Sequence, residues 1–179
     1  MANKIQAVTS DSTINLALDT IRIKKQALIF ANTKRSAEKT AEDISSNIKE
    51  ASKELEELSE QILHILSRPT KQCERLAKCI KKGIAFHHAG LTHKQKELIE
   101  DNFRNGLIKI IACTPTLAFG LDLPAFRTIM KDLRRYGHHG LTWIPTLEYL
   151  QMAALEPAQK SLHIADSLIL LFQQLKMMS

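Results

Sequence analysis

Residues 83–125 read GIAFHHAG (83–90), LTHKQKELIEDNFRNG (91–106) and LIKIIACTPTLAFGLDLPA (107–125), and this stretch decides the fold. The apolar runs at 84–86 and 108–113 predict buried strands. Between them, Thr92 and Gln95 form a capping box, which predicts a helix that ends at Gly106. A strand, a helix and a second strand in this order favour a parallel sheet. Small or polar residues follow each strand, so a phosphate or nucleotide could approach the backbone there.

The same alternation extends in both directions along the chain. Apolar runs at 26–31 (QALIFA) and 128–133 predict two further strands. Apolar side chains at helical spacing predict helices around 14–21, 37–48, 55–65 and 73–80, and a short helix at 145–153. We therefore expect an α/β domain over residues 1–153, with a parallel sheet covered by helices on both faces. Residues 154–179 are expected to form a helical tail, because Ala165, Leu168, Phe172 and Leu175 share one helical face.

Composition sets broad limits on what this chain can be. The 179 residues are 44% hydrophobic and 25% charged, which is ordinary for a globular protein, and the formal net charge is +6. The basic balance gives weak support to an anionic partner such as nucleic acid. Three cysteines without paired spacing argue against a disulfide framework, and no apolar run is long enough to cross a membrane. We expect a reducing, cytoplasmic location with no membrane partner.

Three short segments contain the polar residues of interest. The first, Asn32-Thr33-Lys34-Arg35-Ser36, follows a strand and begins a helix, where free N–H groups attract phosphate. An ordinary helix cap with solvated basic residues would have the same sequence.

The second segment, His87-His88-Ala89-Gly90, could suggest zinc, with His93 as a third ligand. Consecutive strand residues point to opposite faces, so the paired rings cannot both face one metal ion. No cysteine or carboxylate cluster completes such a site, and we expect no metal. His138-His139 is interpreted in the same way, as an exposed loop.

The third segment runs from Thr114 to Pro124 (TPTLAFGLDLP). Thr114 is suited to cap a helix and Pro115 to its first position. Thr116 offers a hydroxyl and an amide to a phosphate, and Asp122 could accept hydrogen bonds from ribose hydroxyls after a tight return at Gly120. Taken alone, this segment is equally compatible with a plain strand-to-helix loop.

Together, the order and spacing of these segments resemble the second motor domain of superfamily two helicases. The His-Ala-Gly turn, the helix after it and the Thr-x-Thr-x-x-x-Gly-x-Asx-x-Pro pattern are similar to the superkiller-like branch, which includes archaeal fork-repair helicases and the helicase part of polymerase theta. The resemblance covers roughly residues 14–153 and implies a RecA-like fold.

The resemblance also implies roles for individual residues. The nucleic-acid strand would be bound by residues of all three segments: Asn32, Thr33, Arg35, His88, Ala89, Gly90, Thr114 and Thr116. Gly90 would let the backbone come close, and His88 would bond or stack. The ATP side of the cleft would include Gly120 and Asp122, although relatives often carry Asn at position 122. The implied cofactor is ATP with Mg²⁺, and the implied partners are single-stranded or forked DNA, with RNA as an alternative, and a first motor domain.

Two departures from the family pattern limit what this chain can do alone. Residues 144–153 (IPTLEYLQMA) match the lead-in to an arginine motif, Gln-Met-x-Gly-Arg-x-Gly-Arg, but the chain continues ALEPAQK and lacks both arginines. The chain also has no phosphate-binding loop and no Asp-Glu-x-His magnesium motif. We therefore expect this chain to be one half of a two-domain motor, with no catalytic residues of its own.

A helicase relic that binds nucleic acid without catalysis is the second interpretation, and an α/β nucleotide-binding enzyme of another family is the third. Residues 154–179 are compatible with a native packing helix, a frameshifted segment or a truncation product.

Overall fold

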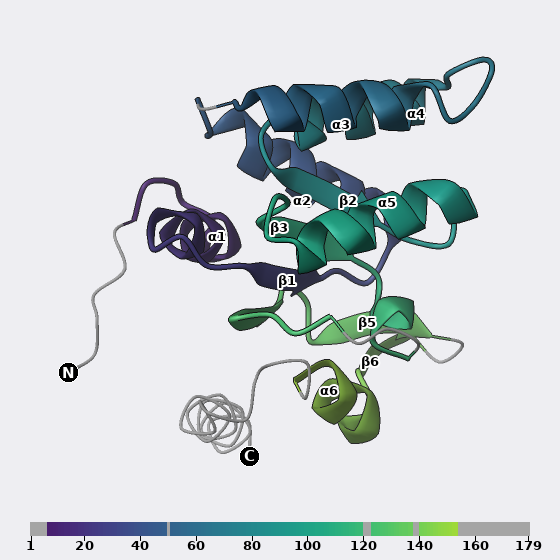
Figure 1. The fold of residues 1–179 in the computed structure, drawn as a ribbon. Helices are drawn as coiled ribbons and strands as arrows, with labels where there is room; N and C mark the ends of the chain where they lie inside the picture. Colours follow the sequence, from purple (N-terminus) through teal and green to yellow (C-terminus); the bar gives the residue numbers. More distant parts are fainter. Residues whose placement is uncertain (1–6, 50, 120–122, 138–139, 154–179) are drawn as a thin grey trace.

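The computed structural model describes residues 7–49, 51–119, 123–137 and 140–153. Its centre is a parallel sheet of four strands in the order β2-β3-β1-β4 (Figure 1). These strands are β1 (Ala27–Phe30), β2 (Ile84–His87), β3 (Ile110–Cys113) and β4 (Arg127–Met130). The four expected strands are present, and β4 begins and ends earlier than the apolar run at 128–133 had indicated.

The described part of the chain contains six α-helices. Their bounds are α1 (Ser12–Arg22), α2 (Lys34–Ser46), α3 (Lys53–Leu63), α4 (Lys71–Ile80), α5 (His93–Arg104) and α6 (Thr146–Ala153). The chain passes from β1 beyond β3 to β2 through α2, α3 and α4, and then returns to β3 through α5. Because the two steps run in opposite directions, right-handed crossovers put α2 and α5 on opposite faces. Helices on both faces and a parallel sheet confirm the expected α/β class.

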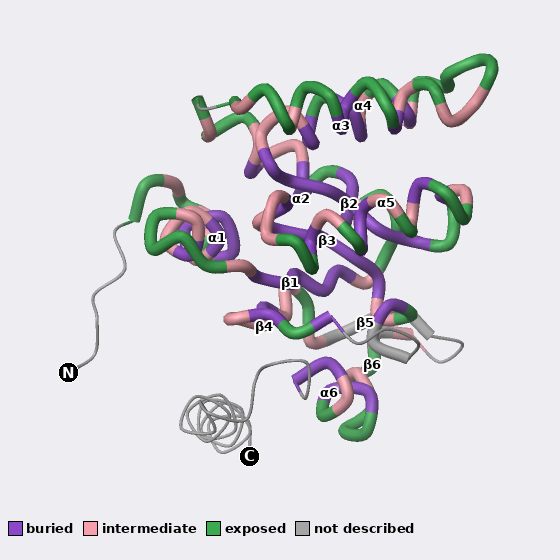
Figure 2. The backbone as a smooth tube through the Cα atoms, in the orientation of Figure 1, coloured by how far each residue is buried: buried purple, intermediate pink, exposed green. Residues whose placement is uncertain are grey.

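The core lies between the sheet and these helices. Every residue of β1, β2 and β3 is buried, which explains why these strands read as continuous apolar runs rather than as alternating ones (Figure 2). All three cysteines are buried and free. The apolar stripe of α3 packs Leu58 and Ile62 into the core, so this stripe belongs to a core-facing helix.

The helix ends follow the local sequence signals. Thr70 caps α4 by accepting a hydrogen bond from the Cys73 N–H, and Thr92 and Gln95 form the expected capping box of α5. Gly83, which follows α4, has φ +72°, a conformation that residues with a side chain rarely adopt. The chain therefore turns sharply from α4 into β2 where the sequence predicts it.

One feature was not expected from the sequence. The strands β5 (Arg134–Gly137) and β6 (Gly140–Trp143) pair as a short antiparallel hairpin. The helical start expected at Pro115 is present as a 3₁₀ helix, η1, which spans Pro115–Phe119. The helix α6 contacts η1. His138 and His139, Gly120 and Asp122, and the expected tail at 154–179 lie outside the described residues. Among the described residues, no helix has the length and apolarity needed to cross a bilayer.

Candidate nucleic-acid interface

The register of the sheet brings the three polar segments to one edge. His87 of β2, Cys113 of β3 and Phe30 of β1 are aligned as neighbours across the strands. Each is the last residue of its strand, so the residues that follow emerge side by side. The Ala31 N–H donates to the Cys113 carbonyl at 2.9 Å, and the Thr114 N–H donates to the His87 carbonyl at 3.2 Å. Segments more than 20 residues apart in sequence thus form one continuous polar edge, here called the carboxyl edge.

At this edge, α2 begins with an exposed basic turn. Thr33 is the N-cap, and its hydroxyl accepts a hydrogen bond from the Ser36 N–H at 3.1 Å. Lys34 and Arg35 are exposed, and within the described residues neither forms an ion pair. The positive end of the helix dipole and these two exposed cations make this turn favourable for an anion. Asn32, just before the cap, is half-buried.

The loop after β3 presents two threonines. The Oγ1 atoms of Thr114 and Thr116 are 2.9 Å apart and hydrogen-bonded to each other. Thr114 is buried and Thr116 is exposed, so the second hydroxyl faces outward from the first. The Leu117 N–H donates to the Thr114 carbonyl at 3.1 Å, and Pro115 occupies the first position of η1, where no N–H is needed.

The turn after β2 is built differently, because its histidine points inward. His88 is only 1% exposed, and its ring stacks parallel to Phe86 with centroids 5.6 Å apart. Its Nε2 lies 2.9 Å from Oε1 of Glu38, and its Nδ1 accepts a hydrogen bond from the Gly90 N–H at 3.0 Å. The ring, which the resemblance would place on the nucleic acid, is therefore occupied inside the protein. Ala89 and Gly90 form the exposed part of the turn.

His87 takes the opposite direction from His88. Its Nε2 lies 2.8 Å from Oε1 of Glu100 on α5, whereas His88 meets Glu38 on α2. This divergence confirms that the two rings face opposite sides of the sheet. In the described part of the chain, no group of three or more His, Cys, Asp or Glu residues is arranged to hold a metal ion.

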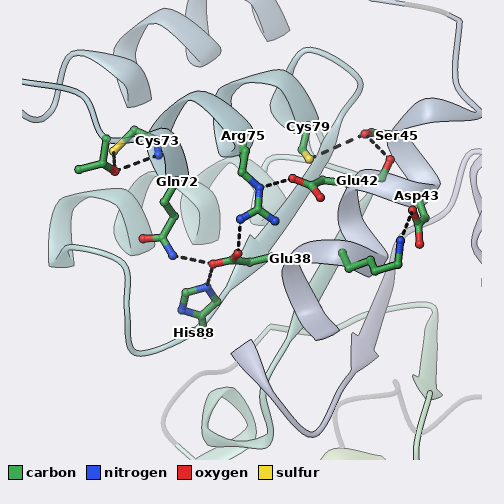
Figure 3. A network of polar contacts seen from close by, with 11 residues as sticks. Glu38, Glu42, Asp43, Ser45, Gln72, Cys73, Arg75, Cys79 and His88 are labelled. Atoms are coloured by element: carbon green, nitrogen blue, oxygen red, sulfur yellow. Dashed lines mark hydrogen bonds and ion pairs between the residues drawn. The ribbon is translucent and has the colours of Figure 1, made fainter. Parts of the chain in front are cut away.

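Glu38 is the centre of a polar network beneath the carboxyl edge (Figure 3). Its Oε1 accepts hydrogen bonds from His88 and from Gln72 Nε2 at 2.6 Å, and its Oε2 pairs with Arg75 at 2.6 Å. Arg75 also pairs with Glu42. The network joins α2 and α4 to the turn after β2. No sequence signal identified Glu38, because its partners lie 34 to 50 residues away along the chain.

Burial determines the charge of both histidines. Desolvation lowers the pKa of His87, although Glu100 opposes this shift. Desolvation also lowers the pKa of His88, against the influence of Glu38. For Glu38, burial favours the neutral acid, but hydrogen bonds from Gln72 and His88 and the charge of Arg75 outweigh it and lower the pKa. Near neutral pH, the site therefore contains neutral imidazoles and an ionised carboxylate.

Comparison with known proteins identifies the family of this chain. Residues 47–152 match the family described as the helicase conserved C-terminal domain. The chain belongs to this family. It is a second RecA-like domain of the superfamily two, Hel308 type.

The curated relatives are longer proteins. Over 150 residues the chain is 43% identical to the ATP-dependent DNA helicase Hel308 of Methanococcus vannielii, covering 82% of this chain and 20% of that protein. Over 156 residues it is 42% identical to the protein of the same name from Pyrococcus horikoshii, covering 86% of this chain and 22% of that protein. The chain thus spans about a fifth of the length of these relatives.

Proposed function

We propose that this domain is the second motor domain of an ATP-dependent DNA helicase of the repair type and that its carboxyl edge grips the phosphates of a single strand. The observation that supports this most directly is the alignment of the three strand ends in a domain of the helicase family. Thr33, the Ala89–Gly90 turn and Thr116 are all exposed along that edge. Backbone-directed contacts of this kind suit translocation, because a motor must hold every sequence equally well.

The proposed contacts combine charge with hydrogen bonding. Arg35 and the start of α2 attract the phosphates, and Asn32 lies beside them. The exposed Thr116 hydroxyl donates to a phosphate oxygen, and Thr114 supports it by donating its own proton to Thr116 Oγ1 within the hydrogen-bonded pair. Gly90 allows close approach of the strand. His88 takes part by shaping the turn, since its ring is buried.

ATP would be held between two domains rather than by this one alone. Gly120 and Asp122 are the residues we assign to the ATP side of the cleft. The chain contains no phosphate-binding loop and no acidic magnesium motif, so ATP with Mg²⁺ depends on a first motor domain. We place the working protein in the cytoplasm, on single-stranded or forked DNA. RNA is the alternative substrate.

Fluorescence anisotropy with labelled single strands of several sequences tests the proposed grip. We expect dissociation constants of about 10⁻⁴ to 10⁻⁶ M that differ little between sequences. Arg35→Ala and Thr116→Ala should weaken binding to every sequence by a similar factor. A strong preference for one base sequence, or no binding at low salt, would contradict the proposal.

A second candidate function is a helicase relic that binds nucleic acid without catalysis. The observation that favours it is the sequence ALEPAQK (154–160) in place of the two arginines, which would otherwise stabilise charge on the γ-phosphate. The relic and the working motor can be distinguished by joining the first motor domain to this chain, with and without a restored Gly-Arg-x-Gly-Arg after Ala153, and measuring ATP hydrolysis. DNA-stimulated ATP hydrolysis only in the restored protein is the result expected for a relic. Equal hydrolysis in both would mean that the arginines come from elsewhere.

A further inference from the structure

The turn at the carboxyl edge depends on one tautomer of His88. A backbone N–H can only donate, so Nδ1 of His88 must be unprotonated to accept the Gly90 N–H at 3.0 Å. The ring proton therefore sits on Nε2, where it is donated to Oε1 of Glu38 at 2.9 Å. The space around the turn is tight as well. A Cβ atom on Gly90 would lie 3.0 Å from both Nδ1 and Cε1 of the His88 ring.

Glu38 is in turn fixed by α4. Gln72 donates to the same carboxylate oxygen as His88, and Arg75 pairs with the other oxygen (Figure 3). The side chain of Glu38 is 9% exposed, so this carboxylate has little water to compensate for a lost partner. Two helices thus hold one imidazole, and the imidazole holds the exposed turn.

We propose that Glu38 is a positioning residue for nucleic-acid binding: it holds His88 in the tautomer that fixes the Ala89–Gly90 turn, and protonation of His88 releases that turn. The inference rests on the proposed grip on single strands and adds a pH dependence to it. Glu38 itself touches no nucleic acid, because it is buried beneath the turn.

Protonation of His88 converts Nδ1 from a hydrogen-bond acceptor into a donor. A proton on Nδ1 faces the Gly90 N–H with a second donor, and the hydrogen bond between them is lost. The charged groups around the ring act in both directions. Glu38 favours the protonated ring, Lys34 on α2 and burial oppose it, and Arg75 on α4 neutralises part of the Glu38 charge. His87, the neighbour on β2, points to the other face and pairs with Glu100. Release is therefore expected below the ordinary histidine pKa of about 6.5.

The first test uses the complete 179-residue chain and removes the carboxylate. Glu38→Ala should weaken binding to a labelled oligo-dT strand at pH 7.5 by about tenfold, because the turn loses its preorganised form. Asp43→Ala is the matched control, since Asp43 also lies on α2, carries the same charge and pairs with Lys39 at the exposed surface. We expect the control to bind as tightly as the unmodified chain or slightly more tightly.

The second test does not require Glu38→Ala to fold. The unmodified chain should lose affinity for the strand between pH 6.5 and 5, while ¹⁵N NMR follows His88 from the Nε2–H tautomer to the charged form. His88→Asn places an amide oxygen near the position of Nδ1 and cannot titrate, so its binding should vary much less with pH. His93→Asn, at an exposed histidine, should keep the pH profile of the unmodified chain.

The outcomes separate the two proposals. If the unmodified chain binds the strand but its pH profile survives His88→Asn, or if folded Glu38→Ala binds as the control does, the positioning role is wrong and the grip stands. If the unmodified chain binds no single strand at low salt, the grip fails and the positioning role fails with it. An NMR spectrum with Nδ1 protonated at pH 7.5 would also overturn the inference.

Discussion

The turn at residues 88–90 and the loop at 114–116 lie on neighbouring strand ends but are held in opposite ways. The His88 side chain is buried, stacked and bonded to a carboxylate that two further side chains support. In the loop, Thr114 and Thr116 bond to each other, and Thr116 stays exposed. The turn therefore exposes the backbone of Ala89 and Gly90, held in place by the buried His88 ring, whereas the loop exposes a side-chain hydroxyl. Substitutions in the turn should act mainly through folding, and substitutions at Thr116 should act mainly on binding.

The largest expected effect is the loss of the support beneath the turn. Glu38→Ala leaves Arg75 and His88 without their shared acceptor, and we expect it to lower the free energy of unfolding by about 2–3 kcal/mol. Urea denaturation followed by circular dichroism measures this. Asp43→Ala, on the exposed side of the same helix, should change stability by less than about 0.5 kcal/mol. Equal stability of the two variants would show that the network contributes nothing.

Acidification should destabilise the fold through the same residues. Burial lowers the folded-state pKa of His87 and His88, so below about pH 6.5 the unfolded chain binds protons that the folded chain does not. The stability present above pH 6.5 is lost as pH falls, by up to about 1.4 kcal/mol per pH unit for each histidine. Glu38 stays ionised in this window because its pKa is lowered. Urea midpoints at pH 7.5, 6 and 5 measure the slope, and a flat profile contradicts it.

A smaller effect is expected from crowding the turn. Gly90→Ala puts a methyl group about 3.0 Å from the His88 ring, and we expect a cost of about 1 kcal/mol as the ring shifts. The NMR signals of His88 should move at the same time. Ala89→Ser changes an exposed neighbour and should leave both stability and the His88 signals nearly unchanged. A Gly90→Ala variant with unaltered His88 signals would mean that the turn is looser than the contacts indicate.

The smallest effect on stability is expected at the loop. Thr116→Ala removes an exposed hydroxyl, so the free energy of unfolding should change by less than about 0.5 kcal/mol. Single-strand affinity should nevertheless fall by about tenfold, because a hydrogen bond to a charged phosphate is lost. Ser46→Ala, at an exposed hydroxyl at the end of α2, is the control for both measurements. A Thr116→Ala variant that binds normally would remove this loop from the interface.

Much of the fold could be predicted because its signals are local. Buried parallel strands read as apolar runs, and Thr70, Gly83 and the Thr92–Gln95 pair mark helix ends through their own backbone chemistry. The alignment of the three polar segments is consistent with the expected parallel sheet, since parallel strands end at one edge of a sheet. The β5–β6 hairpin was missed because RRYG lacks an apolar run or alternation, GLTW alternates over only three residues, and none of the usual hairpin dipeptides lies between them.

The direction of the His88 side chain could not be predicted in the same way. Strand alternation separates His87 from His88, but it does not say which carboxylate each ring will meet. Glu38 lies 50 residues before His88, and in the sequence it is only one more charged residue on an amphipathic helix. The pairing depends on how α2 and α4 pack against β2, which is a property of the assembled fold.

The salt dependence of single-strand binding tests the central claim, that the carboxyl edge grips phosphates, most directly. Affinity should fall steeply as salt increases, and Arg35→Ala should reduce the slope of log K against log salt by about one, because one phosphate contact no longer releases a counterion. Lys39→Ala removes the same charge from the second turn of α2, away from the strand ends, and should leave the slope unchanged. If both variants change the slope equally, or if neither does, binding does not depend on this edge and the account is wrong.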